Sequence, residues 1–185
     1  MQQVIVQKFG GTSVGSGERI AAVAEIIKNE AEMNTVVVVV SAMAGETDRL
    51  IELSKLFGGN PNKREFDALI STGEKVSASL LAMALNSLGL KAKSYSAAQV
   101  SLKTTSNFSK AKILDIDKTK MEEILADGSI PIITGFQGIT ETGEVTTLGR
   151  GGSDTTAVAI AASLKANRCD IYTDVDGIYT TDPRI

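Results

Sequence analysis

The sequence contains no histidine, no tryptophan and only one cysteine, Cys169, and these absences exclude several kinds of active site. Without histidine the chain can form no Ser–His or Cys–His catalytic pair, and a zinc centre is unexpected because its usual ligands are missing. A single cysteine forms no intrachain disulfide, which suits a reducing cytoplasm. Cys169 leads into an apolar strand, so we expect a buried, unreactive thiol. Any chemistry therefore depends on Lys, Arg, Asp, Glu and hydroxyl groups.

Aromatic residues and excess charge are also scarce. Aromatics make up 4% of the 185 residues, and the net charge is −3 without a basic cluster, which together argue against nucleic-acid binding. We expect no membrane span, because the most apolar run, residues 36–40, is bounded by Thr35 and Ser41. The N-terminus has no signal-peptide pattern. A hydrophobic content of 43% is that of a globular domain with a core.

The apolar pattern alternates between strands and helices along the chain. Strands are expected at 4–6, 35–40, 91–96, 113–116, 130–134 and 170–175, and helices at 20–31, 50–57, 64–70, 75–88, 118–125 and 155–164. Thr47 or Asp48 is expected to cap the second helix. The run at 35–40 has no polar alternation, as in a strand covered on both faces. The sequence therefore predicts an α/β fold, a three-layer αβα sandwich with a mainly parallel sheet. Residues 97–112 follow no clear pattern.

The segment at 4–15 has the arrangement of a phosphate-binding loop. Its strand is followed by Lys8, Gly10, Gly11, Thr12 and Ser13, and then by a helix. Glycines let backbone N–H groups approach an anion, and the start of a helix adds partial positive charge. The lysine precedes the glycines, so this is not a P-loop, and Ile20 stands where a dinucleotide fingerprint needs its third glycine. An ordinary tight turn between strand and helix is the alternative.

A second anion site is predicted at the start of the last helix. The residues there are Arg150, Gly151, Gly152, Ser153 and Asp154. The glycines free the backbone, Ser153 is expected to cap the helix, and Arg150 can bind a carboxylate or phosphate through two hydrogen bonds. Asp154 either favours the helix start electrostatically or holds a cation such as Lys8.

The chemistry-bearing loops are expected to meet at one edge of the sheet. Ligands of parallel sheets lie beyond the C-terminal ends of the strands. This rule brings together the loops at 8–13, 41–47, 135–138, 149–154 and 173–177. In the last loop, Asp174 and Asp176 are either plain turn residues or contacts to a nucleotide or its magnesium.

Four segments resemble those of aspartate kinases, a branch of the amino-acid kinase family. They are KFGGTSV at 8–14, STGE at 71–74, GRGGSDTT at 149–156 and YTDVDG at 172–177, and the resemblance covers essentially the whole chain. It implies transfer of the ATP γ-phosphoryl group to the β-carboxylate of L-aspartate. The product would be 4-phospho-L-aspartate, at the entry to lysine, threonine and methionine synthesis. Acetylglutamate, glutamate, carbamate and uridylate kinases look different around the second glycine loop.

The resemblance also implies a role for each matching residue. Lys8 and Asp154 would be catalytic; Lys8, Gly10, Gly11, Thr12, Ser13 and Ser41 would contact the phosphates; Thr173, Asp174, Tyr179 and Arg184 would lie along the nucleotide; Thr47, Glu74, Arg150, Gly151, Gly152 and Ser153 would bind aspartate. Mg²⁺ would bridge the phosphates without protein ligands of its own. An aspartate side chain has a pKa of about 3.9, so the nucleophile needs no general base, which suits a chain without histidine.

The family pattern extends further than this sequence. Family catalytic domains continue past the position of Ile185 and are usually followed by regulatory domains. Residues 1–185 are therefore expected to be one incomplete catalytic domain, with its C-terminal part missing, cytoplasmic and homodimeric. Two alternatives stay open: a related amino-acid kinase with another carboxylate substrate, and a catalytically incompetent fragment that binds a nucleotide or anion.

Overall fold

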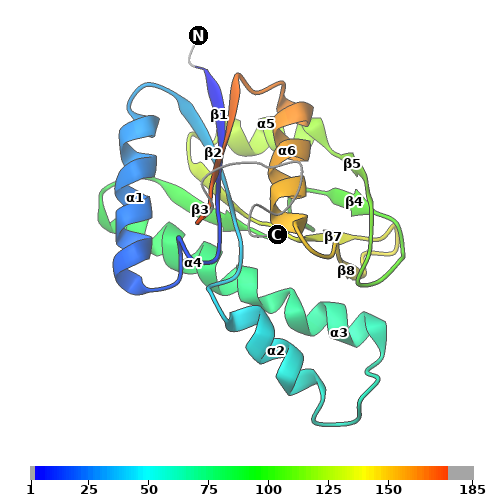
Figure 1. Ribbon diagram of the computed structural model, residues 1–185. Coiled ribbons are helices and arrows are strands. Elements are labelled where there is room, and N and C mark those ends of the chain that lie inside the picture. The colour runs from blue at the N-terminus through cyan, green and yellow to red at the C-terminus, as the bar shows by residue number, and fades with distance from the viewer. Residues whose placement is uncertain (1–2, 175–185) are drawn as a thin grey trace, which may run out of the picture.

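The computed structural model describes residues 3–174, and within them a parallel sheet lies between two layers of helices (Figure 1). The sheet has the strand order β3-β6-β2-β1-β9. Its strands are β1 (Val4–Phe9), β2 (Thr35–Val40), β3 (Ala92–Tyr95), β6 (Ile130–Thr134) and β9 (Arg168–Tyr172). Every neighbouring pair is parallel. The predicted three-layer αβα sandwich is confirmed.

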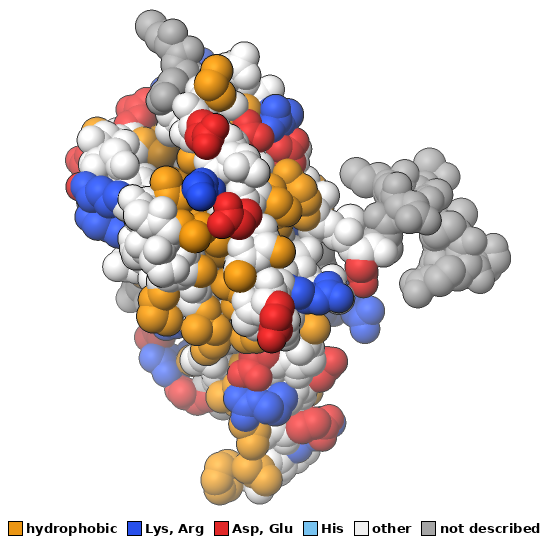
Figure 2. All heavy atoms as spheres, turned by 90° about the vertical axis from the view of Figure 1, so that its left-hand side faces the viewer, with side chains coloured by type: hydrophobic (Ala, Val, Ile, Leu, Met, Phe, Trp, Pro, Cys, Tyr) orange, Lys and Arg blue, Asp and Glu red, His pale blue; other side chains and the backbone are white. Residues whose placement is uncertain are grey.

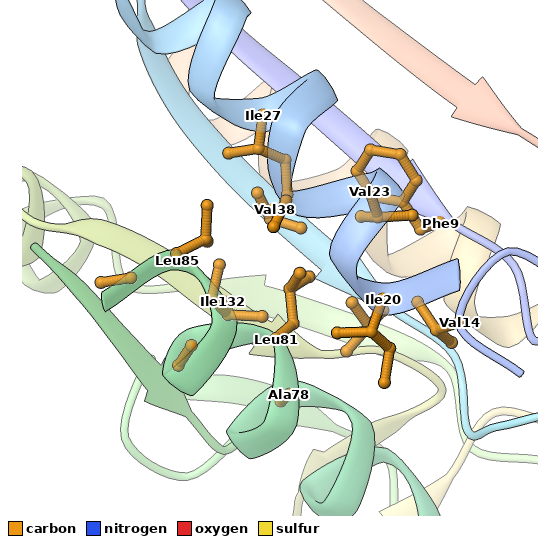
Figure 3. Close-up of a cluster of buried hydrophobic side chains, with 14 of the residues drawn as sticks. Phe9, Val14, Ile20, Val23, Ile27, Val38, Ala78, Leu81, Leu85 and Ile132 are labelled. Atoms are coloured by element: carbon orange, nitrogen blue, oxygen red, sulfur yellow. The ribbon is translucent and has the colours of Figure 1, made fainter. Parts of the chain in front are cut away.

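Helices α1 (Gly17–Ala31) and α4 (Thr72–Ser87) cover one face of this sheet. Figure 3 shows their apolar side chains meeting over the strands, with Ile27 of α1 and Leu81 of α4 directed at Val38. The helical spacing of these residues in the sequence produces the apolar stripe that the sheet buries. Ser16 begins α1 as its N-cap, because its Oγ accepts a hydrogen bond from the Arg19 N–H at 3.3 Å.

Helices α5 (Lys118–Ala126) and α6 (Gly152–Leu164) cover the opposite face. Their side chains, including Met121 and Ile160, form a second buried cluster with Val37 and Val39 of β2. The remaining valines of β2 belong to the first cluster. A strand that sends alternate side chains into two cores must be apolar throughout, so the uninterrupted valine run follows from its central place.

A second, smaller sheet lies beside α6 and was only partly predicted. It has the order β5-β4-β7-β8, formed by β4 (Leu102–Thr104), β5 (Ile113–Ile116), β7 (Gln137–Ile139) and β8 (Val145–Thr147). The hairpin expected around 140–144 joins β7 to β8, with Gly143 at φ 83°. β4 has only three residues, too few to show a period in the sequence. This sheet ends at Thr147 and directs the following loop to the C-terminal edge of the large sheet.

Helices α2 (Glu46–Ser54) and α3 (Lys63–Ile70) form an arm that projects from the body (Figure 1). The expected cap at Thr47 or Asp48 is wrong, because α2 begins at Glu46 and has no side-chain cap. Gly45 is the N-cap instead, at φ 80°, a conformation that glycine adopts without a steric penalty. The break between α3 and α4 is also shorter than the four residues expected, since only Ser71 lies outside both helices.

The segment at 63–87 differs from the expectation that the chain contains no candidate membrane span. By length and composition alone it is long and apolar enough to cross a membrane. Half of its most apolar stretch is buried inside the protein, and it carries the buried carboxylates of Asp67 and Glu74. A core helix has this character, and here it supplies one wall of a cavity.

Large hydrophobic side chains are exposed at two places on the surface. Figure 2 shows them scattered over the face that α1 covers and gathered at the lower end of the molecule. Exposed residues on α1 and α4 include Ile26 and Met83, and the turn after α2 exposes Leu56 and Phe57. Among the described strands, β9 forms one edge of the large sheet. The expected homodimer stays a prediction.

The small sheet has no room for a side chain at Gly138. A Cβ there would lie 2.2 Å from Thr104 Cγ2 and 3.1 Å from the Leu102 carbonyl oxygen. We expect Gly138→Ala to lower the free energy of unfolding by about 1–3 kcal/mol, measured by urea denaturation. Gly17→Ala is the matched control, because nothing lies within 4 Å of its Cβ position in α1. It should leave stability unchanged or raise it by up to about 1 kcal/mol. Equal effects would mean that the close contact is absent.

Candidate active site

A cavity of about 620 Å³ lies at the C-terminal edge of the large sheet. Its walls come from the end of β1, the loop after β2, all three helices of the segment at 46–74, and the loop that leads into α6. The lining residues that were predicted as site residues are Lys8, Ser41, Thr47, Glu74, Arg150, Gly151, Gly152, Ser153 and Asp154. Residues from distant parts of the sequence therefore meet where the strand-edge rule predicts a ligand.

Lys8 and Asp154 form an ion pair at one end of this cavity. The Lys8 side chain is 9% exposed, and its Nζ lies 2.7 Å from Asp154 Oδ1. Asp154 Oδ1 is itself buried, so the two charges meet away from solvent. A nearly buried ammonium requires an opposite charge, and Asp154 supplies it from the first turn of α6. The predicted contact between these two side chains is present.

The start of α6 presents backbone N–H groups at the edge of the same cavity. The expectation that Ser153 caps this helix is wrong: Gly151 is the N-cap, at φ 71°, and no side chain caps the helix. The Ser153 side chain instead packs against Gly135, whose Cβ position lies 2.7 Å from Ser153 Oγ. The first N–H groups of a helix have no intrahelical acceptor. Together with the exposed guanidinium of Arg150, they make this end suitable for an anion.

Glu74 supplies a buried carboxylate to the wall of the cavity. It is 2% exposed, and its Oε1 accepts a hydrogen bond from the Ala42 N–H at 3.2 Å. Its Oε2 is fully buried and has no hydrogen-bond partner among the described residues. Burial, opposed by the backbone hydrogen bonds, raises the pKa of Glu74 to about 7. The arrangement suits a ligand that brings a positively charged hydrogen-bond donor.

The glycine loop follows Lys8 at the end of β1. Among the described residues, those of this loop do not line the cavity. The loop comprises Gly10, Gly11, Thr12 and Ser13. Gly10 approaches Lys8, whose Nζ lies 3.4 Å from the Gly10 Cβ position. Gly11 has a packing role, because a Cβ there would lie 2.7 Å from the Ala42 carbonyl oxygen. A role for this loop in binding phosphates stays a prediction.

The remaining predicted residues lie at or beyond the end of β9. Thr173 and Asp174 are exposed just after the strand, and Tyr179 and Arg184 lie outside the described residues. Their places along a nucleotide stay predictions. Cys169 in β9 is half-buried and not fully buried as expected, and burial raises the pKa of its thiol.

Sequence reasoning missed several polar residues in the cavity wall. Ser109 and Thr147 line it, and both bind the buried carboxylate of Asp67. Asp67 and Glu74 lie seven residues apart on one helical face, so two acidic residues within an apolar stripe were the available signal. Phe136, also in the wall, has φ 70°, which the sequence did not indicate.

Comparison with known proteins agrees with this geometry. The model of the "Amino acid kinase family" matches residues 3–185. The chain belongs to the amino acid kinase family. An aspartokinase from Geobacillus stearothermophilus is 58% identical over 182 residues, which is 98% of this chain and 45% of that protein. This member of the family thus spans slightly less than half the length of that curated relative.

Two solved structures extend the comparison to the fold. The aspartate kinase from Synechocystis is 49% identical, with a TM-score of 0.83, over 98% of this chain and 30% of that one. Aspartokinase III from E. coli, solved with aspartate and ADP, is 29% identical, with a TM-score of 0.82, over 98% of this chain and 52% of that one. Both relatives share the three-layer architecture described above.

Glu74 should make the stability of the protein depend on pH near neutrality. Its pKa is raised from 4.5 to about 7 on folding, so the folded state favours the protonated form. The contribution of protonated Glu74 to the stability of the folded state is therefore present in full below pH 4.5 and is lost as the pH rises through about 7. We expect the stability difference between wild type and Glu74→Gln to change by up to about 3 kcal/mol across this window, measured by urea denaturation.

The exposed Glu141 offers a matched control for this measurement. Glu141→Gln should follow the wild-type pH profile, because this exposed residue is not among the lining residues of the cavity and the substitution leaves Glu74 in place. A wild-type profile parallel to that of Glu74→Gln would show that the Glu74 carboxyl titrates normally.

Proposed function

We propose that this protein is an aspartate kinase, which transfers the γ-phosphoryl group of ATP to the β-carboxylate of L-aspartate. The observation that carries the proposal is the unpartnered Oε2 of Glu74, buried in the same cavity as Arg150 and the Lys8–Asp154 pair. This combination offers an anion for an ammonium and cations for carboxylate and phosphate groups. A free amino acid with an acidic side chain carries the matching charges.

The two ends of the cavity suit different parts of the substrate. Glu74 is placed to bind the α-ammonium group, and Arg150 to bind a carboxylate through two hydrogen bonds. Thr47 of α2 contributes a hydroxyl to the same wall. The β-carboxylate is ionised at neutral pH, so it attacks without a general base. A cavity wall without histidine is adequate for this chemistry.

Phosphoryl transfer then depends on positioning and on neutralising charge. Lys8 is placed to contact the phosphates, with Asp154 orienting its ammonium and the start of α6 adding N–H donors. Within residues 3–174 no group of three or more acidic, Cys or His side chains could hold a metal ion. A Mg²⁺ ion that accompanies ATP needs few protein ligands, since it keeps several waters and binds phosphate oxygens, and it would neutralise phosphate charge.

The similar proteins support the substrate and the nucleotide. The relatives named above are two aspartokinases and an aspartate kinase, and one of the aspartokinases was solved with aspartate and ADP. The proposal extends to amino-acid biosynthesis leading to lysine, threonine and methionine, to a cytoplasmic location and to a homodimer. The single cysteine suits the cytoplasm, and the apolar residues exposed on α1 and α4 suit self-association.

The reaction itself is the first test. We expect ADP release from ATP-Mg that depends on L-aspartate, with glutamate, N-acetylglutamate and uridylate run in parallel. Release with another substrate alone would overturn the aspartate assignment. ATP binding in calorimetry without release for any substrate would leave a nucleotide-binding protein and no kinase.

Lys8→Ala should lower kcat by at least about 100-fold, because it removes the cation beside the transferred phosphoryl group. Circular dichroism should stay native, since the Asp154 side chain that loses its partner is 47% exposed. Lys28→Ala, at a partly exposed site in α1, is the control and should keep full turnover. A Lys8→Ala protein with near-normal kcat would remove Lys8 from the mechanism.

Glu74→Gln should raise the KM for aspartate by about 10- to 100-fold and leave the KM for ATP unchanged, because only the amino acid has an ammonium group. In the wild type the KM for aspartate should fall as the pH rises through about 7, where Glu74 ionises. The variant should lack this dependence. If the KM for aspartate stayed at its wild-type value, Glu74 would be only a structural residue of α4.

A further inference from the structure

Asp67 is a buried carboxylate that the mechanism above does not use. It is 0% exposed in the middle of α3, and no lysine or arginine among the described residues pairs with it. Four hydrogen bonds satisfy it instead. Oδ2 accepts from the backbone N–H groups of Ser109 at 2.8 Å and Thr147 at 2.7 Å, and Oδ1 accepts from their hydroxyl groups at 2.9 and 3.0 Å. A carboxylate in this position holds two backbone segments at once.

These two segments lie next to each other in the wall of the substrate cavity. Thr147 ends β8 and stands three residues before Arg150. Ser109 lies against the same loop, with its carbonyl oxygen 3.5 Å from the Cβ position of Gly149. A further hydrogen bond, from the Ala111 N–H to the Thr147 carbonyl at 2.9 Å, closes the cluster. The backbone before Arg150 is therefore fixed relative to α3.

The segment at 63–74 connects the same cluster to Glu74. Asp67 lies two turns before Glu74, with Ser71 as the single break between the two helices. The backbone at this break is fixed by a hydrogen bond, because Gln137 Nε2 donates to the Ser71 carbonyl oxygen at 3.0 Å. Both supports come from the small sheet, which also positions Arg150.

We propose that Asp67 is a positioning residue that fixes the distance between Glu74 and Arg150, and thereby the fit of the amino-acid substrate. The inference rests on the proposed function, since it assumes that these two residues bind the ends of one amino acid. Asp67 does not touch the substrate, because it is not in the cavity wall. It acts through Ser109 and Thr147, which both line the cavity.

The hydrogen-bond pattern allows the negative charge of Asp67 to be removed while the geometry of the cluster is kept. Both N–H donors meet one carboxylate oxygen and both hydroxyls meet the other. An asparagine can therefore keep all four bonds, with its oxygen accepting from the N–H groups and its NH₂ donating to the hydroxyls. Alanine loses all four and leaves buried donors unpaired. Asp67→Asn is consequently the conservative variant and Asp67→Ala the disruptive one.

The test is steady-state kinetics of both variants with aspartate and with ATP. Asp67→Ala should raise the KM for aspartate by about 10-fold and change the KM for ATP by less than about 2-fold, because only the amino-acid ends are displaced. Asp67→Asn should stay within about 2-fold of wild type in both constants. An unchanged KM for aspartate in Asp67→Ala, or equal damage in the two variants, would overturn the proposal.

Two isosteric variants cover the case in which Asp67→Ala does not fold. Thr147→Val removes one hydrogen bond to Asp67, whereas Thr146→Val removes a buried hydroxyl contact with Thr104, which is not part of the cavity wall. Both threonines are buried neighbours in β8. Thr147→Val alone should raise the KM for aspartate, by about 3-fold. Equal KM values for aspartate in the two would overturn the positioning role.

Hydrogen exchange distinguishes failure of this inference from failure of the proposed function. If the wild type shows no aspartate-dependent turnover, the proposed substrate fails. Amide exchange at 109–111 and 147–150 still decides whether Asp67 fixes these segments. Faster exchange there in Thr147→Val than in Thr146→Val supports the inference, and identical exchange overturns it.

Discussion

The ammonium of Lys8 is the constraint on which the architecture of the site depends. It stands near the C-terminal end of an inner strand with 9% of its side chain exposed, and a charge so placed requires a partner. Asp154 provides it only if α6 begins where β1 ends. The chain reaches that point through a tight loop in which Gly149 and Gly151 have φ of 83° and 71°, conformations that favour glycine. The glycines of this motif are thus required by the ion pair as much as by a ligand.

Local sequence patterns predicted this part of the molecule well. The valine run of β2 and the helical stripe of α1 follow from short-range spacing, and the rule that places ligands at the C-terminal edge brings Lys8 and Asp154 together. Their pairing was one of two alternatives for Asp154 and was implied by the resemblance to aspartate kinases. The small sheet and the Asp67 cluster could not be predicted in the same way. Asp67 finds its partners 42 and 80 residues further along the chain, and residue type alone does not encode which distant backbone N–H will face a carboxylate. The start of α2 was wrong for a related reason: a glycine N-cap leaves no side-chain signal, so Thr47 and Asp48 were the only visible candidates.

The arm and the small sheet are joined by polar contacts and not by a core of their own. Besides the bonds to Asp67 and Ser71, Arg64 of α3 pairs with Glu144 in the β7–β8 turn at 2.6 Å. That pair is about half exposed and contributes little stability. The buried hydrogen bonds have narrow ranges of distance and direction, whereas apolar packing tolerates small shifts. The cavity must stay open for a ligand, so packed side chains cannot hold its walls apart. The buried hydrogen bonds to Asp67 and Ser71 fix the positions of these walls instead.

The charged groups of the cavity differ in whether another side chain of the protein already pairs with them. We relate the unpaired group to substrate binding and the paired group to the chemical step. Glu74 Oε2 has no partner among the described residues, and burial raises the pKa of this carboxyl to about 7, so a ligand ammonium gains a strong contact as soon as it binds. Lys8 is already paired with Asp154, so in the proposed reaction its contact with a phosphate is weaker in the ground state. Only interactions that strengthen in the transition state accelerate a reaction. In the proposed reaction Lys8 has this property, because its attraction grows as charge shifts between the phosphoryl group and its neighbours, whereas Glu74 binds the ammonium of the proposed substrate before the reaction begins.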